Sequence, residues 1–140
     1  MSKRNFYSGQ YQISKHAFLA AVHYGLQYKD WLREYKTLLD GIKGIDYTSD
    51  KVKVSQSADL TYKLVSRRIE LLGKMRKVEE AAQEADPFYM KWLLKMATIE
   101  DCTYARLKSP EDKDIPPIPC ERTKFYELRR KFYYLLSKKI

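Results

Sequence analysis

The basic residues near the end of the chain are those whose types and spacing could do chemistry. The segment IPCERTKFYELRRKFYYLLSKK, residues 118–139, contains seven Lys or Arg side chains and is predicted to be helical from near Cys120. Lysine and arginine bind phosphate groups, and arginine can also form a bidentate pair with guanine. The segment therefore predicts either a helix that contacts nucleic acid or a basic helix at the surface of a helical bundle.

Helical periodicity separates the side chains of this segment by type, with an apolar stripe on one face and polar or basic side chains on the other. A helix in the major groove of DNA needs this layout, because one face anchors it, the opposite face contacts bases and the flanks contact phosphates. The apolar stripe consists of Phe125, Leu128, Phe132, Leu135 and Leu136. The residues predicted to bind DNA are Arg122, Thr123, Lys124, Tyr126, Glu127, Arg129, Arg130, Lys131, Lys138 and Lys139.

Individual roles on this face follow from side-chain chemistry. Arg130 can pair with guanine, Glu127 can accept a hydrogen bond from cytosine, and Thr123 can contact a thymine methyl group or a phosphate. Backbone N–H groups at the start of the helix are further phosphate donors. Lys138 and Lys139 extend the electrostatic footprint.

Other interpretations of the same helix stay open. Basic flanks on an amphipathic helix are often only solvated, and cations near a helix C-terminus also complement its dipole. Tyr126, Tyr133 and Tyr134, which lie among basic side chains, also suit a protein interface. Binding to a membrane surface would need the apolar face that the core requires, so no membrane partner is expected.

The remaining reactive residues do not form a recognisable site. His16 and His23 share a helix face but have no nearby Cys or carboxylate with metal-ligand spacing, so neither a metal nor a cofactor is expected. Cys120, at a helix start beside Arg122, could have a lowered pKa. No hydrolase, metalloprotease or P-loop motif occurs, and we expect no enzymatic activity.

Composition limits the class of protein. With 140 residues, 44% hydrophobic residues and a formal net charge of +9, the chain suits one globular domain that favours anionic partners. No apolar run reaches the roughly 20 residues that span a bilayer, and no secretion signal precedes residue 14. Two cysteines, Cys102 and Cys120, suit a reducing compartment, so we expect a cytoplasmic protein.

Periodicity predicts an all-α helical bundle with these elements. Ser14 caps a first helix, a second helix runs from Asp30 to Ile42, and residues 43–59 form a loop, with a short strand at KVKV as an alternative. Asp59 caps a long helix over 60–85. The next helix begins with Asp86 as cap and Pro87 at its first position, and places Phe88 on the same face as Trp92, Leu93 and Met96.

The last part of the chain completes the predicted organisation. Residues 103–108 form a short helix, and residues 109–119, with four prolines, are not helical. We expect a flexible basic arm over 1–13, an N-terminal helical portion over 14–85 and a DNA-binding portion over 86–140, packed as one domain.

A family resemblance is carried by DPFYMKWLLKMATIEDCTYARLK, by IPCERTKFYELRRKFYYLLSKK, and upstream by KHAFLAAVHYGLQYKDWLREY and residues 44–87. The order of these segments resembles the RinA/ArpU-type transcriptional regulators of prophages and mobile elements, whose C-terminal helix-turn-helix is similar to region 4 of sigma factors. The resemblance implies that 103–108 is the supporting helix and 120–139 the recognition helix. The eleven residues 109–119 replace the usual turn of about three or four residues.

The resemblance implies a function in the cytoplasm of a bacterial host. The expected protein is a phage or mobile-element regulator of transcription that binds double-stranded DNA as a monomer or homodimer and contacts host RNA polymerase. The alternative is a helical protein-interaction module, such as a phage-encoded inhibitor of a host defence or transcription protein.

Overall fold

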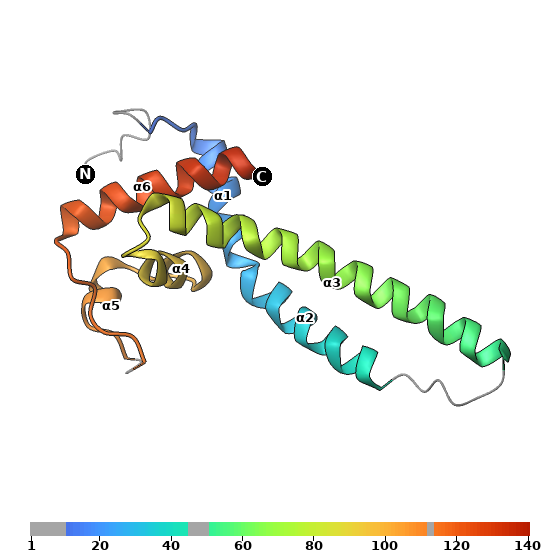
Figure 1. Ribbon diagram of the computed structural model, residues 1–140. Helices are drawn as coiled ribbons and strands as arrows, with labels where there is room; N and C mark the ends of the chain where they lie inside the picture. Colours follow the sequence, from blue (N-terminus) through green and yellow to red (C-terminus); the bar gives the residue numbers. More distant parts are fainter. Residues whose placement is uncertain (1–10, 45–50, 112–113) are drawn as a thin grey trace. The chain divides into compact units, whose positions relative to one another are not determined.

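The structure, a computed structural model, describes residues 11–44, 51–111 and 114–140, with the side chains of 51–57 left out. These residues form helices and no strand, which confirms the all-α prediction (Figure 1). The helices are α1 (Lys15–Leu26), α2 (Tyr28–Lys43), α3 (Lys51–Ala85), α4 (Met90–Thr98), α5 (Tyr104–Lys108) and α6 (Arg122–Lys139).

The chain divides into two compact units. Unit 1 comprises Met1–Gln27 and Lys77–Ile140, and unit 2 comprises Tyr28–Arg76. The C-terminal part of α3 therefore belongs to unit 1 and the rest of it to unit 2. Most of the predicted arm, 1–13, lies outside the described residues, but Ile13 at its end is buried.

In unit 1, α1 packs against α4 and α6. The Ser14 side chain caps α1 as predicted, because it accepts a hydrogen bond from the Ala17 backbone N–H at 3.1 Å. Phe18 and Ala21 point into the core. Gly25 lets α1 and α4 approach closely, since a Cβ atom added there would lie 2.9 Å from the Ala97 carbonyl oxygen.

The core face of α6 agrees with the predicted stripe except at its edges. Phe125, Leu128, Phe132 and Leu136 are buried, whereas Leu135 is only half-buried. Tyr133, which the periodicity did not place on this face, is also buried. Helices α1 and α4 pack against α6 on this side.

The segment between α5 and α6 is held by specific hydrogen bonds. The Ile118 N–H donates to the Leu107 carbonyl at 3.0 Å, and the Trp92 indole N–H donates to the Pro116 carbonyl at 2.8 Å. The Tyr104 hydroxyl donates to the Cys120 carbonyl at 2.7 Å. Helices α5 and α6 are thus joined by a long, anchored connection in place of a short turn, and the described part of 109–119 is non-helical as predicted.

Unit 2 is an antiparallel pair formed by α2 and part of α3 (Figure 1). Glu34 accepts a hydrogen bond from the Arg67 Nε at 2.7 Å, and the Arg68 guanidinium lies 4.1 Å from the centre of the Tyr35 ring. Few of the described side chains here are fully covered. The buried hydrophobic residues of unit 2 are Trp31, Leu71 and Met75.

Two predicted boundaries are wrong. Helix α3 begins at Lys51, so residues 51–59 are neither a loop nor a strand, and Asp59 lies inside the helix. No Gly or Pro occurs between residues 51 and 72, and a helix that has already formed extends at little cost through Ser and Asp. Residues 45–50 of the predicted loop lie outside the described residues.

The start of α4 is the second wrong boundary. The helix begins at Met90, not at Pro87. The Asp86 carboxylate accepts a hydrogen bond from the Phe88 N–H at 2.9 Å and stabilises a turn instead of capping a helix. Phe88 is consequently 64% exposed, while Trp92, Leu93 and Met96 are buried as predicted.

Candidate nucleic-acid interface on α6

The outward face of α6 is positioned by the buried face behind it. Because Phe125, Leu128 and Phe132 are held in the core of unit 1, the side chains on the opposite side of the helix must point outward. The first turn is the most open part. The exposed residues of α6 are Arg122, Thr123, Lys124, Glu127 and Lys138, and Arg130 and Lys131 beside them are half-buried.

Cations dominate this outward face. Among the described residues, Arg122, Lys124, Arg130, Lys131 and Lys138 form no ion pair, and Glu127 is the one carboxylate on the helix.

Three of the cations on this face lie near aromatic rings. Arg122 is 5.8 Å from the centre of the Tyr104 ring, Lys131 is 5.9 Å from that of Tyr11, and Lys138 is 5.2 Å from that of Tyr134. These ring contacts leave the positive charges uncompensated, so the face is chemically suited to an anion.

Two of the predicted DNA-binding residues make contacts within unit 1. The Arg129 guanidinium lies 4.9 Å from the centre of the Phe18 ring of α1 and 5.4 Å from that of Tyr133. Lys139 forms ion pairs with Glu84 at 2.9 Å and Glu80 at 3.7 Å, and the hydrogen bond to Glu84 raises its pKa. Both side chains lie on the core side of α6.

Tyr126 is a third residue that differs from the rest of the predicted set. Its ring packs edge-on against Phe125, with 5.2 Å between ring centres, and the side chain is half-buried. Tyr126 therefore lies at the border between the outward face and the interior. The structure places the remaining residues on the outward face: Arg122, Thr123, Lys124, Glu127, Arg130, Lys131 and Lys138.

The start of α6 has no side-chain cap. Glu121 occupies the N-cap position, but its side chain makes no capping hydrogen bond, and the first turn contains no acidic residue. The backbone N–H groups of a first helical turn lack intrahelical partners and favour an anion. Arg122 and Lys124 extend from this same turn, so backbone and side-chain donors occur together there.

Cys120 does not have the lowered pKa that its position suggested. Burial raises the pKa of the Cys120 thiol and outweighs the opposing effect of Lys108 and Lys124. Cys102 and Cys120 are both in the thiol form and are not joined by a disulfide bond. His16 and His23 are exposed, and the described part of the chain contains no cluster of His, Cys, Asp or Glu that could hold a metal ion.

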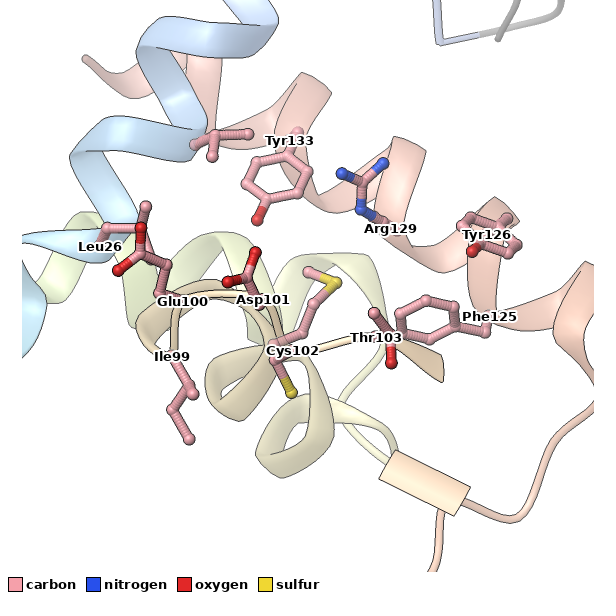
Figure 2. Close-up of a pocket in the computed structure, with 12 residues that line it drawn as sticks. Leu26, Ile99, Glu100, Asp101, Cys102, Thr103, Phe125, Tyr126, Arg129 and Tyr133 are labelled. Carbon is pink, nitrogen blue, oxygen red and sulfur yellow. The ribbon is translucent and has the colours of Figure 1, made fainter. Parts of the chain in front are cut away.

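A pocket of about 380 Å³ lies behind the outward face, between α1, α6 and the segment that follows α4 (Figure 2). Figure 2 shows the Tyr133 hydroxyl pointing into the pocket on the side of Asp101. Burial raises the pKa of Tyr133 to about 12. Asp101 has a φ of 57°, an uncommon conformation for a residue other than glycine. The lining residues are Val22, Leu26, Met96, Ile99, Glu100, Asp101, Cys102, Thr103, Phe125, Tyr126, Arg129 and Tyr133.

The pocket and the outward face differ in chemistry. The pocket combines apolar walls with both acidic and basic side chains, whereas the outward face is mainly cationic. Sequence periodicity did not predict the pocket, because it is formed by α1 docking against α6. Its sequence signal is weak, since Glu100 and Asp101 resemble an ordinary solvated loop.

Comparison of the chain with protein-family models, curated proteins and solved structures finds no match. Among the described residues, no helix combines the length and the apolar character needed to cross a membrane.

Proposed function

We propose that the chain binds double-stranded DNA through the outward face of α6. The observation that carries the proposal is the difference between the two sides of this helix. One side is apolar and buried, and the other presents cations without ion-pair partners among the described residues. Helices α2 and α3 instead mix both signs, as in the pair formed by Arg67 with Glu34 and Glu70. A cationic helix face attracts the phosphate backbone.

The proposed contacts divide into two groups. Arg122, Lys124, Lys131 and Lys138 contact phosphates and set the affinity, together with the N–H groups of the first turn of α6. Arg130, Thr123 and Glu127 lie between these cations on the outward face and contact base edges. We leave Arg129, Lys139 and Tyr126 out of the contact set because their side chains pack within unit 1.

The biological role that we propose is regulation of transcription in a phage or mobile element within a bacterial cell. This part rests on the resemblance of residues 86–108 and 118–139 to RinA/ArpU-type regulators. Host RNA polymerase is the protein partner that such a role implies. The long connection before α6 is the main difference from a standard helix-turn-helix.

The alternative that we propose is a helical protein-interaction module, such as an inhibitor of a host defence or transcription protein. The half-buried tyrosines of α6 favour it, since Tyr126 and Tyr134 lie among cations, and protein interfaces are enriched in tyrosine and arginine. Such a module would bind a protein through α6 and show no salt-dependent affinity for DNA.

A matched pair of variants tests the DNA-binding proposal. Arg122→Ala with Lys124→Ala removes two cations from the outward face, and Lys29→Ala with Lys36→Ala removes two exposed cations from α2. We expect the first pair to weaken binding to a labelled random duplex at low salt by at least about tenfold, because each lost phosphate contact reduces affinity. The second pair should change it far less.

Equal losses in the two double variants would show that only net charge matters, and would contradict a site on α6. Absence of wild-type binding at low salt would also reject the proposal and favour the protein-interaction alternative. Arg130→Ala should then be compared across duplex sequences, because loss of a base contact relaxes sequence preference, whereas Lys138→Ala should weaken all sequences alike.

A further inference from the structure

An apolar stripe on α3, within unit 2, has no partner among the described residues. Tyr62 is 75% exposed, Ile69 66% and Val65 40%. Their spacing puts them on one side of the helix, and the half-buried Leu72 continues the line. Single exposed apolar residues are ordinary, but an aligned group on one helix face marks an interaction surface.

The other side of the same helix already packs on α2. Leu71 is buried, and Leu64 faces α2, since a Cβ added to Gly41 would lie 3.7 Å from its methyl group. Arg68, stacked on Tyr35, lies between the two apolar sides. Helix α3 thus has one apolar face that is covered within unit 2 and a second that is not.

Small residues beside the stripe permit close approach of another helix. Gly73 and Ser66 lie next to Tyr62 and Ile69 on the helix surface. A Cβ added at Gly73 would meet nothing within 4 Å, so packing within the chain does not require this glycine. Glycine in a helix interior is less favourable than alanine. Without its Cβ, the helix surface has a shallow depression where a bulky side chain can fit.

The charged residues beside the stripe are complementary to the same residues of an identical helix that runs in the opposite direction. Asp59 lies near one end of the stripe and Arg76 near the other, and neither has an ion pair among the described residues. Between them lie Lys63 and Glu70. In this inner pair the positive residue comes first along the chain, whereas in the outer pair the negative residue comes first. An antiparallel copy therefore brings Asp59 to Arg76 and Lys63 to Glu70. A parallel copy would bring like charges together, which is unfavourable.

We propose that this stripe binds the same stripe of a second copy of the chain, with the two α3 helices antiparallel. The two-fold axis passes at the level of Arg67. In this register Tyr62 packs over Gly73 of the second copy and Val65 packs against Ile69 of the second copy. The apolar contacts and the charge pairs fit the same register, which selects a second copy over a partner of unrelated sequence.

The solution mass tests this directly, without DNA, and so does not depend on the function proposed for α6. The chain mass is 16.7 kDa, and we expect sedimentation to show a concentration-dependent shift from this value to twice it. Ile69→Glu should weaken the dimer by at least about tenfold, because it places a charge in the desolvated centre. Phe88→Glu is the matched control, since Phe88 is 64% exposed but lies in unit 1, and it should leave dimerisation unchanged.

Gly73→Gln separates an interface effect from loss of folding. The longer side chain has open space in the single chain and a better helix propensity than glycine, so it should raise the urea midpoint of the monomer. It also fills the depression that Tyr62 of the second copy needs, so it should abolish the dimer. A variant that is more stable and monomeric supports the proposal. A dimer that persists would contradict it.

Charge reversal tests the antiparallel register. Asp59→Arg and Arg76→Asp should each weaken the dimer, and the double variant should restore it because both pairs are re-formed with their signs exchanged. Failure of the double variant to recover would reject this register. A wild-type mass of 16.7 kDa at every concentration would overturn the proposal.

Discussion

At the scale of single residues, Tyr133 links the core of unit 1 to the pocket behind α6. Its ring lies edge-on to Phe18 with 5.1 Å between ring centres, and its hydroxyl points into the pocket. Burial disfavours the phenolate, which raises the pKa of Tyr133 to about 12 from the ordinary value of 10.0. The stability of unit 1 should therefore depend on pH in the alkaline range.

The direction in which stability changes with pH follows from the linkage between folding and ionisation of Tyr133. Below pH 10 Tyr133 is neutral in both folded and unfolded chains, so its contribution to stability is complete. As pH rises from 10 towards 12, the unfolded chain loses the proton first, and stability falls by up to about 1.4 kcal/mol for each pKa unit. Urea unfolding measured across this range should show the loss.

The variant Tyr133→Phe provides the control, because it keeps the ring and removes the titrating group. Its stability should fall less steeply between pH 10 and 12 than that of the wild type. Identical pH profiles for the two proteins would show that Tyr133 ionises freely, and would contradict its burial.

At the scale of elements, the close approach of α1 and α4 depends on Gly25. Gly25→Ala should destabilise the protein by about 1–2 kcal/mol, since the new Cβ would meet the Ala97 carbonyl oxygen at 2.9 Å and overpacking outweighs the gain in helix propensity. Gly73→Ala, where no atom lies within 4 Å, should instead stabilise the monomer by up to about 1 kcal/mol. Thermal unfolding at low protein concentration measures both. Effects of the same sign would contradict this account of α1 and α4.

The presence of the helices could be predicted from the sequence better than their ends. The Ser14 cap depends only on a local hydrogen bond, and it was predicted at the correct helix start. The short helix predicted over 103–108 begins one residue later, at Tyr104, with Thr103 as its cap. The start of α3 was missed because Ser, Asp and β-branched Val are weak helix formers without being helix breakers. Asp86 and Pro87 have the local signature of a helix start but form a turn.

Only those features of the candidate site that depend on the geometry of α6 alone could be predicted from the sequence. The outward positions of Thr123, Lys124 and Glu127 follow from helical geometry alone, and all three are exposed. Arg129 and Tyr133 lie at the edge of the apolar stripe, where α1 decides what is covered. Periodicity within α6 contains no information about Phe18, so the contacts of these residues could not be derived from it.

At the scale of the whole molecule, the two units differ in how much core they contain. Among the described side chains, unit 2 buries Trp31, Leu71 and Met75, whereas unit 1 contains all the other buried hydrophobic residues. Segments with few buried apolar contacts open at lower free energy. The boundary between the two units lies within α3. The periodicity of the sequence predicts this segment as one continuous helix and gives no sign of the boundary.

Hydrogen exchange within α3 tests this difference inside a single element. At concentrations that keep the protein monomeric, amides of 62–70 in unit 2 should exchange faster than those of 78–85 in unit 1, where Val78, Ala81 and Ala82 are fully buried. Higher concentration should slow exchange in 62–70 through dimerisation. Uniform exchange along α3 at all concentrations would contradict the division into units of unequal stability.

The central claim is that the outward face of α6 binds DNA, and a salt titration of wild-type binding to a random duplex tests it most directly. The outward cations proposed to contact phosphates are Arg122, Lys124, Lys131 and Lys138. Each phosphate that they neutralise contributes a slope of about −0.9 to the log–log plot of affinity against salt, so three to four contacts predict a slope between about −2.7 and −3.6. A slope near zero, or no binding at low salt, would contradict the claim.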